Sequence, residues 1–397
     1  MSSSVLPGHH AATEPESFLA AALRTGRAVV VGHGITGHHV VHRLFTESQR
    51  VSRPIQILWV ADHHDRRVAS FGASGWHMPF LEGDPRIAAW SHRSFHSWNI
   101  LSELGLGDYR AAAPSVLLTR DERVPVPRGC PAVPVPVDPG EFSAPFYRRA
   151  AYISDGAVVS SCTLMPNLYR AVSQLPGVRP MRRHIHDIGE LLDLTHDFGA
   201  EVACVAAGDR AQFLLDDQRI EGDLGVVLLA DLARVPQPLD RIVLMDADRY
   251  DELTYSIPHR SCGHVCLGGS SGRLVTEPEE YTELGRGLTD PSRVPSYVTA
   301  LVEEIRDRVL QRLPVLRPAL APGAYQYWYG LRPLAERVIA EWIPRNRTGS
   351  VGVLELGGLG GSGFTVAPAF VEDGLALRRP TPRMESHFGR PTPVHSS

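Results

Sequence analysis

The sequence predicts an α/β protein in which a Rossmann-type, dinucleotide-binding domain is interleaved with a second domain built on an antiparallel sheet. Three observations support this prediction: a glycine-rich strand–turn–helix unit near residue 30, a change to short strands near residue 111, and a second glycine cluster near residue 360. The length of 397 residues suits two domains better than one small core.

The first unit begins with a valine-rich strand and continues with Gly32, Gly34 and Gly37 at the spacing G-x-G-x-x-G. Gly32 permits the tight turn, Gly34 lets a pyrophosphate approach the backbone, and Gly37 lets the next helix pack on the strand. Ile35 and Thr36 open that helix, whose free N–H groups and positive dipole end would face the phosphates.

A second strand at 55–60 is followed by Asp62, and a carboxylate at this point is suited to a ribose hydroxyl. A glycine-rich turn that binds nothing is the alternative, but strand, glycines, helix, second strand and acid together favour an adenine dinucleotide, FAD or NAD. The next stretch, 66–76, holds small residues after Arg66 and Arg67. It either lies against the cofactor, with arginines near the phosphates, or forms an ordinary loop.

From about residue 111, short strands and a proline-rich loop at 125–139 indicate the second, inserted domain. Strands are expected at 28–31, 55–60, 116–118, 124–126, 147–153, 201–208, 225–229, 241–245, 253–258, 264–269, 338–343 and 351–356. Helices are expected at 84–104, 160–175, 291–313 and 364–377. The cofactor domain is predicted to comprise 24–110, 157–222 and 330–378, and the substrate domain 111–156 and 223–329, with loose or partly helical tails at 1–23 and 379–397.

Composition excludes several classes of protein. A net charge of −4 gives no case for nucleic acid, and no apolar run is long enough to span a membrane. The chain contains no lysine, which excludes pyridoxal phosphate enzymes and P-loops; a GC-rich genome is the simplest cause. The first 16 residues do not resemble a secretory signal.

Cysteine and histidine usage predicts no metal site. The five cysteines are widely spaced and form no C-x-x-C pair, so neither a zinc site nor a disulfide framework is expected, and a reducing cytoplasm is the natural location. His38 with His39, and His184 with His186, lack a third ligand nearby in the sequence and are expected to be solvated surface residues.

Five segments, in order, resemble the D-amino-acid oxidase family of flavoproteins. They are the G-x-G-x-x-G unit with Asp62; 75–81 followed by Asp84-Pro85-Arg86; 205–208; Tyr255-Ser256-Ile257-Pro258 with 267–269; and Gly330-Leu331-Arg332-Pro333 followed by 357–365. The resemblance spans about residues 27–377, nearly the whole chain. The later motifs, in this order, are much more specific than the glycine fingerprint, which many folds share.

The resemblance implies an FAD enzyme that oxidises an amine beside a carboxylate. Arg332 would pair with the substrate carboxylate and Tyr255 would help to hold it. The α-hydrogen would pass to the flavin as hydride, and the imine would hydrolyse in water, with O2 as the expected oxidant giving H2O2. The implied FAD contacts are Gly32, Gly34, Ile35, Thr36, Gly37, Asp62, Arg67, Gly75, Trp76, Gly208, Gly330, Gly360, Gly361, Gly363, Phe364 and Thr365.

The residues alone leave Arg332 open to another role, a structural salt bridge with Glu336. The chain also departs from the family, with Asp251 beside Tyr250 where a second tyrosine is common, and Leu359 where a histidine is common. An amine dehydrogenase, a redox-neutral cyclase or a catalytically silent partner module therefore stay as alternatives. The substrate, a free amino acid or a specialised amine of secondary metabolism, its stereochemistry and the oligomeric state are left open.

Overall fold

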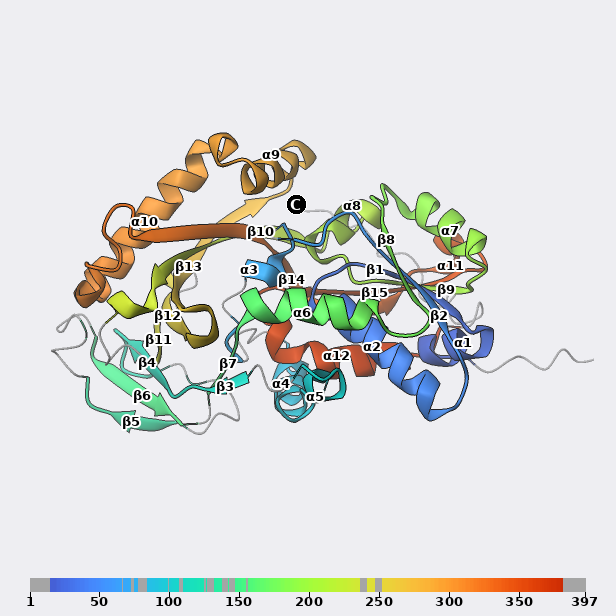
Figure 1. Ribbon diagram of the computed structural model, residues 1–397, viewed down its shortest axis with the longest axis horizontal. Helices are drawn as coiled ribbons and strands as arrows, with labels where there is room; N and C mark the ends of the chain where they lie inside the picture. Colours follow the sequence, from blue (N-terminus) through green and yellow to red (C-terminus); the bar gives the residue numbers. More distant parts are fainter. Residues whose placement is uncertain are drawn as a thin grey trace, which may run out of the picture.

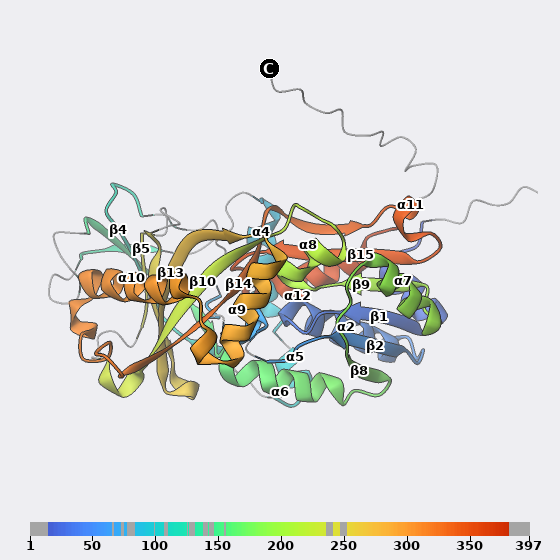
Figure 2. The ribbon, with the colours of Figure 1, turned by 90° about the horizontal axis from the view of Figure 1, so that it is seen from above.

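The computed structural model describes residues 15–380, apart from 66, 73–74, 78–83, 99, 107–109, 125, 127–131, 138–141, 143–146, 155, 236–240 and 247–251. One large mixed sheet runs through the described part of the chain in the order β5-β6-β4-β11-β12-β13-β10-β14-β15-β9-β1-β2-β8. Its two halves lie side by side along the long axis of the molecule (Figures 1 and 2). The predicted α/β class with a parallel and an antiparallel part is confirmed.

The first half of the sheet is parallel. Its strands are β1 (Arg27–Val31), β2 (Gln56–Ala61), β8 (Val178–Arg182), β9 (Val202–Val205) and β15 (Gly352–Leu359). Side chains alternate between the two faces of these strands, and both faces are apolar. Val30 and Trp59 pack on one face, whereas Val29 and Val60 pack on the other.

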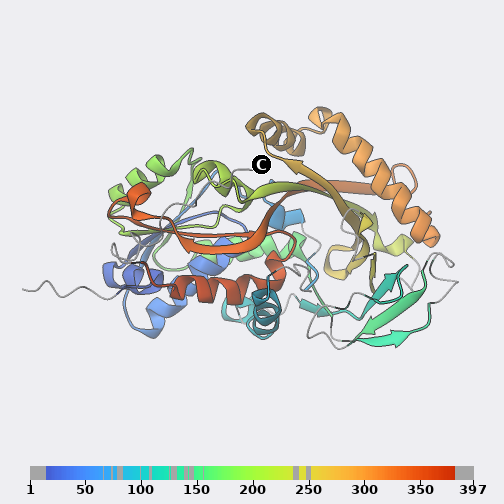
Figure 3. The ribbon, with the colours of Figure 1, turned by 180° about the vertical axis from the view of Figure 1, so that it is seen from behind.

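Helices cover both faces of the parallel half (Figure 3). One face carries α1 (Phe18–Thr25), α2 (Ile35–Arg50), α4 (Arg86–His96), α5 (Ile100–Glu103), α6 (Ser161–Ser173) and α12 (Gly363–Ala376). The other carries α7 (Ile188–Asp197) and α8 (Ala211–Leu214). This arrangement brings the N-termini of α2 and α12 together beside the carboxyl ends of β1 and β15, because each helix follows its strand through a short glycine-rich turn.

The second half of the sheet is antiparallel except for the parallel pair β4 and β11. Its strands are β4 (Ser115–Thr119), β5 (Val133–Val135), β6 (Arg149–Ile153), β10 (Glu221–Asp231), β11 (Ile242–Met245), β12 (Thr254–His259), β13 (His264–Val275) and β14 (Tyr325–Trp342). Helices α9 (Pro278–Thr289) and α10 (Ser296–Arg312) pack over this half (Figure 1). Strand β14 joins the halves by pairing with β10 and then with β15. A separate pair consists of β3 (Arg110–Ala112) and β7 (Ala157–Val159).

Several expectations about elements are wrong. The helix expected at 84–104 is broken into α4 and α5, and Trp98 in the break is buried with its ring stacked on Phe364. Val124 and Val126 are not in a strand, in a stretch where neighbouring prolines lack the N–H that a ladder requires. The strand expected at 338–343 is the end of an 18-residue strand. Sequence periodicity also missed β8, α7 and α9.

The expected environment of the histidine pair on α2 is also wrong. His38 is fully buried and His39 is 5% exposed, because α2 is enclosed by the sheet and by neighbouring helices. The His38 ring forms a hydrogen bond with the Gly34 carbonyl, and burial lowers the pKa of both imidazoles. His184 and His186 are exposed, as expected.

The cysteine spacing also failed to predict that two of the cysteines meet in the structure. Cys162 and Cys262, which are 100 residues apart in the sequence, are joined in the structure.

Of the tails, residues 18–25 form α1, with Phe18 fully buried, while 1–14 and 381–397 lie outside the described residues. Every helix in the described part of the chain is too short or too polar to span a bilayer.

Candidate active site

The glycine-rich turn after β1 is fixed by close backbone contacts. Gly32 has φ +118°, and a Cβ there would lie 2.1 Å from the carbonyl oxygen of Ala206. A Cβ on Gly37 would lie 2.0 Å from the carbonyl oxygen of Gly32. Only glycine fits at either position, so the turn stays tight and α2 packs closely against it. Trp59 supports the turn by donating a hydrogen bond of 2.8 Å to the Gly32 carbonyl.

The turn opens into a cavity of about 1070 Å³ that extends from the parallel half of the molecule to the antiparallel half. Gly32, Gly34, Ile35 and Thr36 line one end, where the positive dipole end of α2 favours an anion. The Ile35 N–H donates a hydrogen bond of 3.0 Å to the Ser70 hydroxyl, which lines the cavity as well. The volume exceeds the usual range for one small ligand, about 300–1000 Å³. A cavity of this size and length suits a dinucleotide together with a substrate.

Asp62 lies after the end of β2 and lines the cavity. His184 approaches the Asp62 carboxylate at 2.9 Å, from the segment after β8. Arg67 also lines the cavity, but its guanidinium is held by Asp65, and this ion pair lowers the pKa of Asp65 to about 2. The structure therefore brings Asp62 and Arg67 together on the cavity wall and gives each a protein partner that sequence reasoning did not anticipate.

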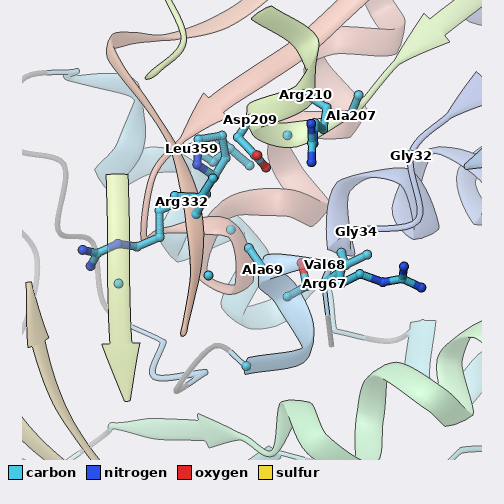
Figure 4. Close-up of a pocket in the computed structure, with 18 of the residues that line it drawn as sticks. Gly32, Gly34, Arg67, Val68, Ala69, Ala207, Asp209, Arg210, Arg332 and Leu359 are labelled. Atoms are coloured by element: carbon cyan, nitrogen blue, oxygen red, sulfur yellow. The ribbon is translucent and has the colours of Figure 1, made fainter. Parts of the chain in front are cut away.

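The turn after β9 supplies two residues that sequence reasoning missed. Gly208, with φ +63°, begins a short 3-10 turn that carries Asp209 and Arg210 along the cavity wall (Figure 4). Burial raises the pKa of Asp209 to about 6. The Arg210 guanidinium lies over the ring of Tyr281, 4.8 Å from its centroid. A signal for these residues was available, because charged residues directly after the glycine that ends a buried strand lie at the ligand-binding edge of an open α/β sheet.

The second glycine cluster meets the first. A Cβ on Gly363 would lie 3.2 Å from the Ile35 side chain, so the N-termini of α12 and α2 are in contact. Gly360, with φ +50°, donates its N–H to the Pro333 carbonyl at 2.7 Å. A Cβ on Gly361 would have no neighbour within 4 Å, and this glycine lines the cavity. The backbone here is accessible to a planar ring system.

At the antiparallel end, two glycines make room for two large side chains. A Cβ on Gly268 would lie 2.6 Å from the Tyr255 hydroxyl, and one on Gly330 would lie 2.3 Å from the Trp328 ring. Tyr255 and Trp328 both line the cavity. Val227, Leu244, Leu253, Ile257, Leu284 and Leu288 complete a largely apolar wall. A ligand at this end is shielded from water and meets few polar groups.

Arg332 is a charged side chain at this end, where Arg286 of α9 also lines the cavity, and Arg332 has a buried partner. Its Nη2 lies 2.5 Å from Oδ2 of Asp223, whose side chain is 1% exposed, whereas the Arg332 side chain is 21% exposed. The two residues are direct cross-strand neighbours on β14 and β10. Gly225 leaves space for the guanidinium, because a Cβ there would lie 3.2 Å from Nε. Figure 4 shows the side chain extending across β10, away from Arg210 and the Gly32 turn.

The cavity thus brings together most of the residues expected to form the site. Those that line it are Gly32, Gly34, Ile35, Thr36, Asp62, Arg67, Gly75, Trp76, Gly208, Tyr255, Gly330, Arg332, Gly360, Gly361, Gly363 and Phe364. Gly37 lies behind the turn, and the Thr365 hydroxyl is directed to the Trp76 carbonyl at 3.3 Å. Tyr250, Asp251, Arg66 and most of the 125–139 loop lie outside the described residues.

A parallel nucleotide-binding half joined to an antiparallel half, with one cavity across both, defines a dinucleotide-dependent oxidoreductase of the two-domain flavoprotein type. The sequence matches the family model DAO, FAD dependent oxidoreductase, over residues 27–372, and the chain therefore belongs to this family. It is an FAD-dependent oxidoreductase, as the sequence resemblance implied. The glycine cradles and the cavity described above fit FAD.

Solved structures show the same fold at low sequence identity. Glycine oxidase from Geobacillus kaustophilus has a TM-score of 0.64 and 16% identity, covering 88% of this chain and 93% of its own. Iminodiacetate oxidase from Chelativorans sp. BNC1 has a TM-score of 0.59 and 18% identity, covering 87% and 93%. L-Proline dehydrogenase from P. horikoshii has a TM-score of 0.60 and 12% identity, covering 92% and 99%. The chain has no match among curated protein sequences.

Proposed function

We propose that this enzyme oxidises the C–N bond of an amino acid, or of an amine that carries a carboxylate, to an imine. The observation that carries the proposal is the position of Arg332 on the wall of the largely apolar, antiparallel end of the FAD cavity, which Tyr255 also lines. A planar guanidinium binds a carboxylate through two parallel hydrogen bonds. The fold likeness to a glycine oxidase and an iminodiacetate oxidase supports a small substrate of this kind.

The proposal assigns the cofactor contacts as follows. The N–H groups at the start of α2, from Gly34 to Thr36, would hold the pyrophosphate, and Asp62 would accept a ribose hydroxyl bond. The backbone of the second glycine cluster would lie against the flavin ring, where N–H groups stabilise negative charge on the reduced ring. When bound, the flavin accepts the two electrons of the substrate as a hydride. Attachment is expected to be non-covalent, since the cluster at 357–365 holds no cysteine or histidine.

The chain's own residues would contribute positioning. Asp223 fixes the Arg332 guanidinium from the facing strand, so the carboxylate-binding donors are already oriented before substrate arrives. Tyr255 and Trp328 would hold the body of the substrate and exclude water. Because Asp223 balances the charge of Arg332, the pair selects its ligand by hydrogen-bond geometry more than by net charge.

This charge balance also favours a second candidate, an amine without a carboxylate. Arg332 with Asp223 is then a structural pair, and the apolar wall alone selects the substrate. The two candidates differ in one measurable property: only the first requires the carboxylate for turnover.

The test is anaerobic reduction of the bound flavin by matched pairs of amino acids and their decarboxylated amines, followed by absorbance of the oxidised flavin. The proposal expects at least one amino acid to bleach the flavin much faster than its amine partner. Bleaching by the amine at an equal rate supports the second candidate. If no compound in a broad panel bleaches the flavin, both candidates fail.

We also propose O2 as the oxidant, giving H2O2. The chain has no lysine to stabilise superoxide beside the flavin, so an arginine, a histidine or the substrate cation would take that part. Stopped-flow mixing of the reduced enzyme with air tests this point. Reoxidation no faster than that of free reduced flavin would make the enzyme a dehydrogenase.

A further inference from the structure

A second group of reactive side chains lies outside the FAD cavity, where the two halves of the molecule meet. Cys162, His259, Cys262 and His264 each offer one ligand atom, and these four atoms all lie within 4.8 Å of one another. His259 is 1% exposed, and the other three are partly buried. We propose that these four residues bind a structural zinc ion.

Three of the four ligands come from one hairpin turn. His259 ends β12 and His264 begins β13, and the two are direct partners in the antiparallel ladder. Their rings lie nearly parallel, with centroids 5.4 Å apart. Cys262 ends the short 3-10 turn between the strands, and Gly263, with φ +69°, reverses the chain directly after it. The H-x-x-C-x-H spacing of this turn therefore brings two imidazoles and one thiol close enough to bind a single ion.

The fourth ligand comes from the cofactor half. Cys162 is the second residue of α6, a helix of 13 residues, and α6 contacts the turn that carries Cys262. A thiol in the first turn of a helix is readily deprotonated, because the helix dipole and the N–H groups stabilise the thiolate. Two thiolates and two neutral imidazoles form the Cys2His2 set of closed structural zinc sites.

The spacing of the two cysteine backbones and the two nearby histidines favours a zinc ion over a disulfide. In the structure Cys162 and Cys262 are joined, with Cα atoms 7.0 Å apart, beyond the usual range for a disulfide of about 4.4–6.8 Å. A tetrahedral zinc ion with Zn–S bonds of about 2.3 Å holds two sulfurs about 3.8 Å apart, which suits wider backbones. A zinc ion would also engage the two histidine rings that converge on the sulfur atoms. In a reducing compartment both cysteines enter as thiols, and zinc binding releases their two protons.

The site would serve as a cross-link between the two halves. It would tie α6 of the cofactor half to β12, the strand that carries Tyr255 four residues before His259. A pocket that includes Cys162, Cys262 and His264 also includes Trp328, which lines the FAD cavity as well. The ion would thus fix the wall of the substrate pocket from behind, without touching the substrate.

The experiment measures metal in the full-length FAD-loaded protein, produced with zinc in the medium and purified with a thiol reductant and without chelator. Elemental analysis is expected to give about one zinc per chain. The Cys162→Ser/Cys262→Ser variant is expected to lose at least about nine-tenths of it, because both thiolates are removed. Cys204→Ser, a buried cysteine outside the cluster, is the matched control and should keep the full amount. The flavin spectrum reports whether each variant is folded.

A second measurement on the unmodified protein covers the case in which the double variant does not fold. Cobalt replacing zinc is expected to produce a long-wavelength absorption band of tetrahedral thiolate-bound Co²⁺, beyond the flavin bands. Alkylation of the denatured protein reports whether Cys162 and Cys262 are thiols or a disulfide. The proposal is overturned if the reduced protein contains no zinc and gains none on addition, if zinc persists in the folded double variant, or if the disulfide survives purification with reductant.

Discussion

Replacing Arg332 tests the proposed substrate contact most directly, because the structure separates its effect on stability from its effect on turnover. Arg332→Leu removes an ion-pair partner of Asp223, whose side chain is 1% exposed. Leaving one charge of a buried pair without its partner typically costs about 3–5 kcal/mol. We therefore expect the single variant to be clearly less stable than the native enzyme, whatever Arg332 does in catalysis.

The double variant Asp223→Asn/Arg332→Leu removes both charges and should recover most of that stability. Any loss of turnover by this double variant can then be attributed to the lost carboxylate contact and not to unfolding. If Arg332 anchors the substrate carboxylate in this desolvated pocket, losing it costs about 2–5 kcal/mol of transition-state binding, a fall in kcat/KM of about 30-fold to several thousand-fold. Arg332→Lys should restore only part of the rate, since an ammonium lacks the planar two-point contact.

The assay combines thermal unfolding, followed by release of flavin fluorescence, with steady-state kinetics on an amino acid and its decarboxylated amine. Arg170→Leu, which alters an exposed arginine on α6, is the control for loss of a guanidinium at a distance. The expected loss is confined to the amino acid. If the folded double variant loses turnover of the carboxylate-free amine just as severely, Arg332 is structural and the proposed contact is wrong.

Three further predictions follow from the buried groups. Gly32→Ala should abolish FAD retention on gel filtration, because the new Cβ would collide with the Ala206 carbonyl. Gly105→Ala, also at positive φ but with nothing within 4 Å of its Cβ, is the control and should keep FAD. Equal FAD retention by the two variants would contradict the role of the Gly32 turn in cofactor binding. Burial raises the pKa of Glu355 from 4.5 to about 8, so the unfolded chain ionises first and stability falls as the pH rises through this interval. Glu355→Gln should therefore raise Tm relative to the native protein more at pH 8 than at pH 5, and a pH-independent difference would refute this. Burial lowers the pKa of His39 from 6.5 to about 3, so stability is lost as the pH falls through this interval. His39→Gln should weaken that loss in acid unfolding curves, and an unchanged curve would contradict the prediction.

The sequence by itself determined the features that depend on local sterics. The spacing of Gly32, Gly34 and Gly37 predicted the tight turn and the helix after it, because the backbone conformation at Gly32 and the absence of Cβ atoms are properties of the residues themselves. The same holds for the strand that precedes the turn. The order of the later motifs also predicted the family and hence FAD, and Tyr255 and Arg332 do line the cavity.

Only the tertiary structure decided which distant residues meet. Asp223 faces Arg332 because of the register between β10 and β14, whereas sequence proximity had suggested Glu336. His38 is buried because the sheet and other helices pack against this part of α2. Cys162 meets the histidine-containing turn of β12 and β13 only because α6 packs against it. The physical reason is common to all three: a residue's neighbours across a sheet or between helices are set by strand register and packing over the whole chain, and no local spacing encodes them.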